Sequence, residues 1–116
     1  MSYVYFARDP DTGLIKIGTT WRVSSRLDCL RRKAPGIELL ASVPGDRRIE
    51  ERFHTLLAED HVGHEWFASS PRVQAVVIAV REGWFDLAKL PTGVNPIRSA
   101  RAVAAWARHH ERQAAA

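Results

Sequence analysis

The sequence contains a single cysteine, Cys29, so no disulfide can form within the chain. Cysteine used this sparingly is typical of proteins in a reducing compartment, and we expect a cytoplasmic protein. No run of about 18 apolar residues is present, which argues against a transmembrane helix and a membrane partner. The most apolar stretch, residues 73–80, is much too short. The first residues lack the basic and apolar segments of a signal peptide, so none is expected.

Acidic residues are scarce in two stretches of the chain, whose net charge is +4. Residues 21–33 hold five basic residues against one acid, and residues 95–116 hold four against one. The segment 34–94 has nine acids and six bases. Two basic stretches around an acidic middle favour a polyanionic partner, either DNA, which we expect first, or RNA; a solvated basic surface is the alternative. The candidate contact residues are Arg22, Arg26, Arg31, Arg32, Lys33, Arg101 and Arg108.

Two segments near the start predict an antiparallel hairpin. Residues 2–8 and 14–20 alternate in the manner of strands, and Asp, Pro and Gly between them form a turn. Side chains alternate between the faces of a strand. If one face, with Val4, Phe6, Ile15 and Ile17, points to the core, Tyr5 and Lys16 project together from the opposite face, which we expect to be open.

Capping residues predict where the helices begin. Ser24 is a suitable N-cap for a helix to about residue 34, and Asp46 for a second helix. Ser70 followed by Pro71 predicts a third. Residues 37–43 read as a strand between the first two helices.

These elements predict an α+β fold with a small three-stranded antiparallel sheet flanked by helices, in the order β-β-α-β-α-α. A further, basic C-terminal helix is expected from about residue 95 to residue 113. We expect residues 1–84 to form the main domain. Residues 85–116 would supply a connection and the basic helix as an extension of it.

Several short motifs lie on these elements. Tyr3-Val4-Tyr5 and Lys16-Ile17-Gly18 stand on the two hairpin strands, and Arg26 follows eight residues after Gly18. Glu50 lies one helical turn before His54, and residues 63–67 read Gly-His-Glu-Trp-Phe. Over residues 3–75 this pattern resembles the GIY-YIG nuclease superfamily, particularly its small phage and bacterial branch.

The chain departs from that pattern at three points. Tyr3 replaces the first glycine, and Lys16 replaces the tyrosine of the second motif, as in some restriction enzymes of the superfamily. An asparagine that many members place after the glutamate has no counterpart, since Asn95, the only asparagine, lies too far downstream.

The resemblance implies a metal-dependent endonuclease that hydrolyses DNA with one divalent cation, Mg²⁺ or Mn²⁺. Glu50 would hold the metal, which stabilises the leaving 3′ oxygen. Arg26 suits the phosphoryl oxygens, because a guanidinium is always charged and matches phosphate geometry. Tyr5 would orient or deprotonate a water molecule.

Two further candidate catalytic residues leave alternatives open. Lys16 is a charged clamp or a base; a free lysine is protonated at pH 7, and making it half neutral costs about 4–5 kcal/mol. Burial or the charge of Arg26 could supply that energy, but we favour the clamp. His54 either supports the metal site or is a packed or capping histidine. Residues 65–67 are interpreted as structural, with Trp66 and Phe67 in the core.

Two other functions compete with an active endonuclease. One is a nuclease-fold module that binds DNA or regulates without cleaving it, which the lysine at position 16 favours. The other is a protein-interaction domain that uses the basic tail on an acidic partner. A domain this small would need a homodimer or a protein partner to be strongly sequence-specific.

Overall fold

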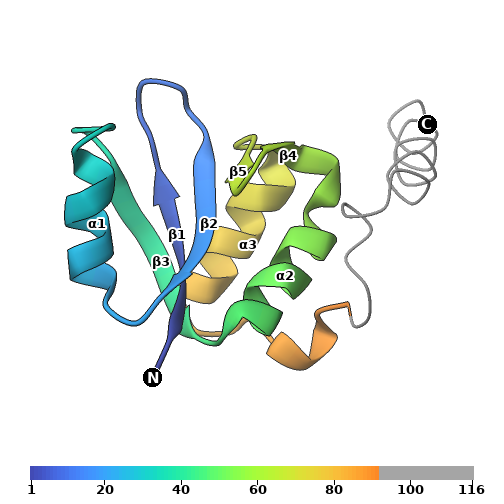
Figure 1. The fold of residues 1–116 in the computed structure, drawn as a ribbon. Coiled ribbons are helices and arrows are strands. Elements are labelled where there is room, and N and C mark those ends of the chain that lie inside the picture. The colour runs from blue at the N-terminus through green and yellow to red at the C-terminus, as the bar shows by residue number, and fades with distance from the viewer. Residues whose placement is uncertain (92–116) are drawn as a thin grey trace, which may run out of the picture.

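The computed structural model describes residues 1–91, which form a five-stranded sheet between two layers of helices (Figure 1). The sheet is antiparallel throughout, in the order β3-β1-β2-β5-β4. Its strands are β1 (Tyr3–Arg8), β2 (Ile15–Thr20), β3 (Glu38–Pro44), β4 (His61–Gly63) and β5 (Trp66–Phe67). The helices are α1 (Val23–Arg31), α2 (Arg47–Leu56) and α3 (Pro71–Arg81), with 3₁₀ turns η1 (Ala58–Asp60) and η2 (Leu87–Lys89).

The α+β class and the hairpin of β1 and β2 are confirmed, but the prediction of three strands is wrong. β5 pairs with the free edge of β2, placing Trp66 opposite Lys16, and β4 continues the sheet. The two added strands have three and two residues, too few to show an alternating pattern in the sequence. His64, in the turn between them, has a left-handed φ of 50°.

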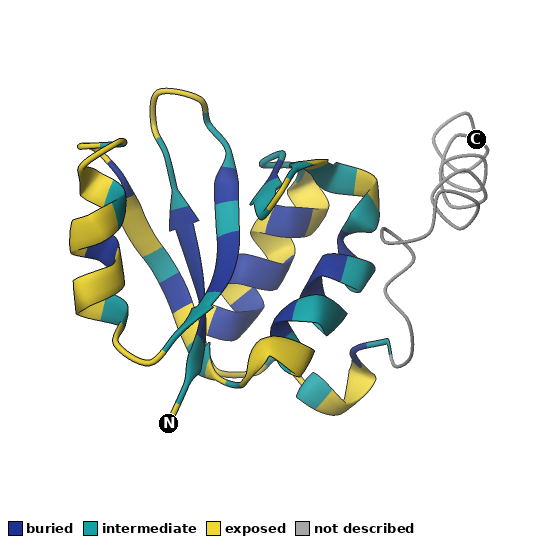
Figure 2. Cartoon of the chain, viewed as in Figure 1, coloured by how far each residue is buried: buried dark blue, intermediate teal, exposed yellow. Residues whose placement is uncertain are grey.

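The larger core lies between the sheet and the helices α2 and α3 (Figure 2). The inward residues predicted for the hairpin, Val4, Phe6, Ile15 and Ile17, are all buried there, which confirms that side of the prediction. Phe53 of α2 packs edge-on against Phe6, with ring centroids 5.2 Å apart. This packing fixes α2 against the back of the hairpin, and thereby fixes the position of Glu50.

Two of the three predicted helix caps are confirmed. Asp46 accepts hydrogen bonds from the backbone N–H groups of residues 48 and 49, and Ser70 accepts one from residue 73. Ser24 is not a cap, because α1 already begins at Val23 with Arg22 at the N-cap position. Only two residues connect β2 to α1, and the Thr20 hydroxyl accepts the hydrogen bond from the Arg22 N–H.

The expectation of an open face behind Tyr5 and Lys16 is wrong. The two residues do share a face, since Tyr5 pairs with Gly18 and Ala7 pairs with Lys16. However, α1 packs on that face, where Leu27 and Ile37 form a second small core with Tyr5 and Ala7. The apolar stripe of α1 requires a partner surface, and this side of the sheet provides it.

The predicted C-terminal helix, with Arg101 and Arg108, lies outside the described residues. The division of the chain after residue 84 therefore stays a prediction. No helix within residues 1–91 is both long enough and apolar enough to cross a membrane.

Candidate functional site

Four of the five predicted catalytic residues meet along β2, together with a fifth residue that the sequence reading treated as structural. We call Tyr5, Lys16, Arg26, Glu50 and Glu65 the polar cluster. Arg26 Nε lies 3.4 Å from Tyr5 Oη, and Lys16 Nζ lies 3.3 Å from Glu65 Oε2. The charge of Glu65 also acts on the pKa values of Tyr5, Arg26 and Glu50, which places these groups around it. The cluster thus joins β1, β2, α1, α2 and the β4–β5 turn.

The hydroxyl of Tyr5 is held against β2 by the absence of a side chain at Gly18. A Cβ built at Gly18 would lie 2.6 Å from Tyr5 Oη, closer than a real contact permits. Glycine at this position is therefore needed for the tyrosine to reach Arg26. This close contact gives a physical reason for the Lys-Ile-Gly motif of β2 to place its glycine opposite Tyr5 of β1.

Arg26 and Tyr5 form a donor–acceptor pair with defined protonation. Burial raises the pKa of Tyr5, and the hydrogen bond from Arg26 opposes this rise only in part. The same hydrogen bond raises the pKa of Arg26. Tyr5 is therefore a neutral phenol that accepts the Arg26 N–H and keeps its own proton to donate. Because Arg26 is exposed, its remaining N–H groups are available to an anion.

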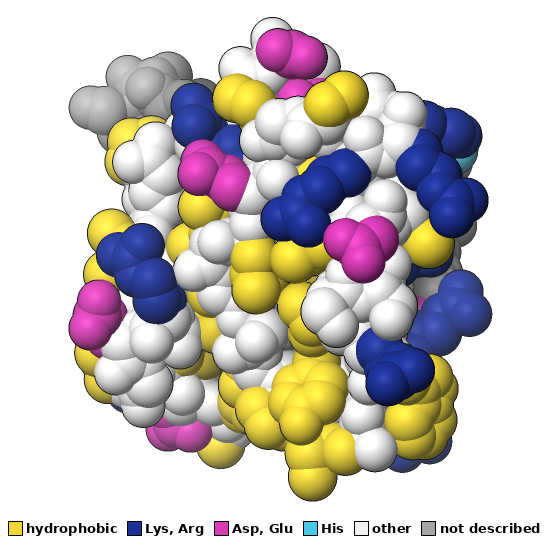
Figure 3. Space-filling model, turned by 90° about the vertical axis from the view of Figure 1, so that its left-hand side faces the viewer, with side chains coloured by type: hydrophobic (Ala, Val, Ile, Leu, Met, Phe, Trp, Pro, Cys, Tyr) yellow, Lys and Arg dark blue, Asp and Glu magenta, His cyan; other side chains and the backbone are white. Residues whose placement is uncertain are grey.

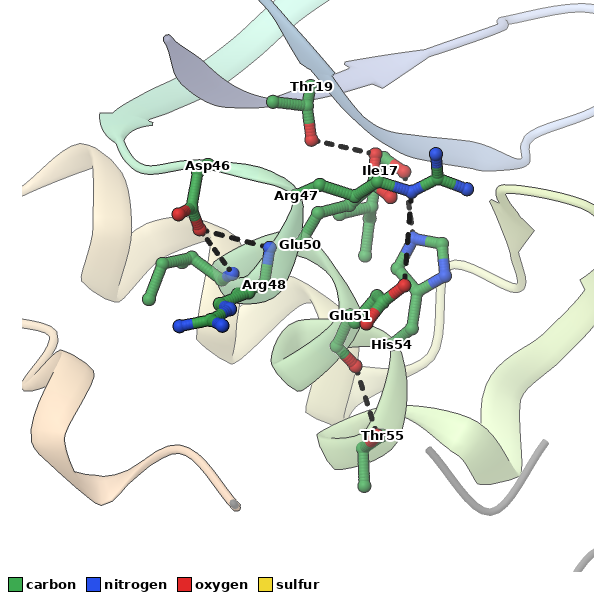
Figure 4. Close-up of polar contacts among 10 residues, drawn as sticks. Ile17, Thr19, Asp46, Arg47, Arg48, Glu50, Glu51, His54 and Thr55 are labelled. Carbon is green, nitrogen blue, oxygen red and sulfur yellow. Dashed lines mark hydrogen bonds and ion pairs between the residues drawn. The ribbon is translucent and has the colours of Figure 1, made fainter. Parts of the chain in front are cut away.

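Glu50 is a carboxylate that is only 7% exposed. The Thr19 hydroxyl donates a hydrogen bond of 2.9 Å to its Oε1 atom (Figure 4). Within residues 1–91, no lysine or arginine forms an ion pair with it. Burial raises the pKa of Glu50, against the opposing effect of the Thr19 hydrogen bond. A buried carboxylate in this state is costly unless a cation approaches it.

His54 lies one turn after Glu50 but makes a different kind of contact. Its Nε2 is 2.9 Å from the Ile17 carbonyl oxygen (Figure 4). Its ring packs edge-on against Phe67. A carbonyl only accepts, so Nε2 carries the proton. These contacts match the alternative in which His54 is a packed histidine. Its Nε2 atom already donates to the backbone of β2, the strand that carries Lys16.

The titration of His54 predicts a loss of stability in acid. Burial lowers the pKa of His54 below 6.5, so the unfolded chain binds the additional proton first. The contribution of His54 to the free energy of unfolding is complete above pH 6.5 and decreases as the pH falls toward the pKa of the folded state. We expect chemical denaturation of His54→Gln and wild type to show a smaller stability difference at pH 5 than at pH 7.5. An unchanged difference would contradict this protonation state.

Lys16 is held between a carboxylate and an aromatic ring. Beyond its ion pair with Glu65, Nζ lies 5.2 Å from the centroid of the Trp66 ring. The lysine side chain is only 14% exposed, so these contacts are partly shielded from water.

Glu65 is the member of the polar cluster that the sequence reading did not place in the site. Its carbonyl accepts a 2.9 Å hydrogen bond from the Ile17 N–H, which fixes the β4–β5 turn beside β2. In the sequence, the available indication that Glu65 belongs to the site was its place directly before two aromatic residues. Its position became clear only through the pairing of β5 with β2.

The predicted basic contact residues within the described part of the chain are all exposed, around α1. Residues 21–33 hold five basic residues against one acid. Figure 3 views this face, where Lys and Arg side chains lie among Asp and Glu, and hydrophobic side chains gather near the lower edge. Arg31 is paired with Asp28 at 3.3 Å. The face therefore presents a net positive surface beside the polar cluster.

Comparison with known protein families gives a match over most of the chain. Residues 2–85, well over half of the chain, match the T5orf172 domain. Among curated proteins and among solved structures, nothing matches the chain significantly.

Proposed function

We propose that this chain, which belongs to the T5orf172 domain family, is an endonuclease that hydrolyses DNA phosphodiester bonds with one divalent cation in the manner of GIY-YIG nucleases. The T5orf172 domain is phage-associated and related to nuclease-like folds, which gives the broad class. The polar cluster supports the more specific proposal of a DNA endonuclease that uses one divalent cation. An arginine, a tyrosine, a lysine and a buried carboxylate from four separate elements meet beside a basic surface.

The Tyr5–Arg26 pair is suited to stabilising charge on a phosphoryl group. Arg26 is a permanent cation with free N–H groups, and it is oriented by its hydrogen bond to Tyr5. The raised pKa of Tyr5 disfavours a role as base. Between the two roles considered for it, the tyrosine therefore orients a water molecule or phosphate oxygen by donating its proton in a hydrogen bond.

Glu50 is the residue that would hold Mg²⁺ or Mn²⁺. Mg²⁺ commonly binds through one or two carboxylates and keeps several waters, so a single buried carboxylate that forms no ion pair within residues 1–91 fits it. Within the described residues no group of three or more His, Cys, Asp or Glu side chains is placed to hold a metal, so a site enclosed by protein is not formed there. When bound, the ion would supply Lewis-acid stabilisation of the leaving 3′ oxygen.

Lys16 acts as a charged clamp in this proposal, because its Nζ atom is held in place by the ion pair with Glu65 and the contact with Trp66. We expect Lys16→Met to reduce the rate of DNA cleavage about a hundredfold, whereas Lys16→Arg keeps the charge and most of the activity. Single-turnover cleavage measures both. Arginine cannot act as a base near neutral pH, so an equally large loss in the two variants would contradict the clamp.

Plasmid cleavage tests the proposed function directly. Supercoiled DNA incubated with the protein and Mg²⁺ or Mn²⁺ should become nicked or linear, and EDTA should prevent the reaction. Equal cleavage in EDTA would overturn the one-metal chemistry. Binding without cleavage under all three conditions would favour the second candidate below.

A module that binds DNA without cutting it is the second candidate. Two observations favour it: Tyr5 is only 1% exposed beneath α1, and Lys16 is tied to Glu65. In this arrangement Tyr5 has almost no surface open to a substrate, and the charge of Lys16 is already paired. This candidate predicts salt-dependent binding by the basic surface and no product.

A further inference from the structure

A hollow of about 390 Å³ opens between the end of β2 and the start of α1. Its lining includes Thr19, Trp21, Arg22, Ser25 and Arg26. The indole of Trp21 is 75% exposed, although it is the largest apolar group at the site. The hollow therefore combines an accessible aromatic surface with two cations and hydroxyl groups.

Two residues that line the hollow connect it to the polar cluster. Thr19 lines it and donates to Glu50, and Arg26 lines it and donates to Tyr5. A ligand in the hollow would therefore lie next to the groups proposed to act on a phosphodiester. Neither contact depends on residues beyond 91.

The surroundings of Trp21 distinguish it from an ordinary exposed aromatic residue. Single exposed apolar side chains are common and need no explanation. Trp84 is such a case: it is 68% exposed and follows α3, which packs on the opposite face of the sheet. Trp21 instead stands between β2 and the basic face of α1, in the two-residue connection beside Arg22. Figure 1 shows this connection below α1, and Figure 3 shows hydrophobic side chains near the lower edge of the α1 face.

We propose that the hollow binds an unpaired nucleotide of DNA, with the Trp21 indole stacked on its base and Arg22 and Arg26 on the adjoining phosphates. The proposal rests on the proposed function and specifies its substrate class as single-stranded or locally unpaired DNA. Aromatic stacking requires a base whose face is free, which a base within a continuous duplex does not offer. Arginines beside the indole contribute sequence-independent attraction to the backbone.

Binding measured in EDTA tests the proposal without requiring catalysis. Fluorescence anisotropy of labelled oligo(dT) and of a labelled duplex would be recorded for the full chain, Trp21→Ala, Trp21→Phe and the matched control Trp84→Ala. We expect Trp21→Ala to weaken oligo(dT) binding about tenfold while duplex binding changes little. Trp21→Phe should keep most of the affinity, and Trp84→Ala should behave as wild type.

The dependence on salt gives a second readout. Trp21 is uncharged, so Trp21→Ala should lower the affinity without changing the slope of log affinity against log salt concentration. Equal losses for oligo(dT) and duplex, no loss in Trp21→Ala, or the same loss in Trp84→Ala would overturn the proposal. Selective single-strand binding through Trp21 in a protein that cuts no plasmid would uphold the hollow and reject the nuclease. Plasmid cleavage by wild type, with no effect of Trp21→Ala on oligo(dT) binding, would uphold the nuclease and reject the hollow.

Discussion

Glu50→Gln is expected to abolish Mg²⁺-dependent cleavage, with a loss of about a thousandfold or more, while DNA binding is retained. The amide keeps the size of the side chain and can still accept the hydrogen bond from Thr19. It removes the negative charge that would hold the metal. Single-turnover cleavage and binding in EDTA, measured on the same preparation, separate the two effects.

The same substitution should make the protein more stable. Burial raises the pKa of Glu50, so the folded state binds the proton more tightly and loses stability as the pH rises through the titration. At neutral pH, we expect the free energy of unfolding of Glu50→Gln to exceed that of wild type by about 0.5–2 kcal/mol. The gain should disappear below the ordinary glutamate pKa of 4.5, where both chains are neutral at this position.

Glu51→Gln is the matched control, because it removes the next carboxylate along α2. Glu51 lies 3.8 Å from Arg47 and is less buried than Glu50 (Figure 4). We expect its cleavage rate to stay close to that of wild type. If Glu50→Gln cut DNA at the wild-type rate, or if Glu51→Gln lost as much activity, the assignment of the carboxylate would be wrong.

Arg26→Ala is expected to have the second largest effect, a reduction of cleavage by about 10²–10³-fold. The substitution removes a permanent cation from the polar cluster and leaves the buried Tyr5 hydroxyl without its donor. Arg26→Lys should recover only part of the rate, because an ammonium restores charge but not the planar fork of the guanidinium. Single-turnover cleavage of one DNA substrate compares the variants.

The control for Arg26 is an arginine on the same helix that points elsewhere. Arg31 is exposed and paired with Asp28, so Arg31→Ala should weaken DNA binding slightly and leave the rate of the bound complex unchanged. A loss in Arg31→Ala as large as in Arg26→Ala would reduce both residues to general contributors of positive charge. Full activity in Arg26→Lys would show that the planar fork of the guanidinium is not required.

The parts of the fold predicted correctly are those determined by neighbours in the sequence. The hairpin follows from alternation and a turn, and the helix starts at Asp46 and Ser70 follow from caps that act within three residues. The two short strands were missed because their pairing depends on an edge of β2 that is more than forty residues earlier in the chain. The packing of α1 over Tyr5 likewise depends on contacts that no local sequence pattern specifies.

The candidate site shows the same division. Tyr5, Lys16, Arg26 and Glu50 could be named because their motifs resemble those of the GIY-YIG superfamily, and the structure brings them together along β2. Their electrostatic roles could not be predicted, because burial determines the protonation of Tyr5 and the cost of charge on Glu50. Glu65 was placed by long-range strand pairing alone.

Cleavage of supercoiled plasmid by wild type and Glu50→Gln, side by side in Mg²⁺ and in EDTA, tests the central claim most directly. We expect nicked or linear product only from wild type in Mg²⁺, with Glu50→Gln folded, at least as stable, and still bound to DNA. Product from Glu50→Gln at the wild-type rate, or from wild type in EDTA, would contradict a nuclease that depends on a metal at Glu50.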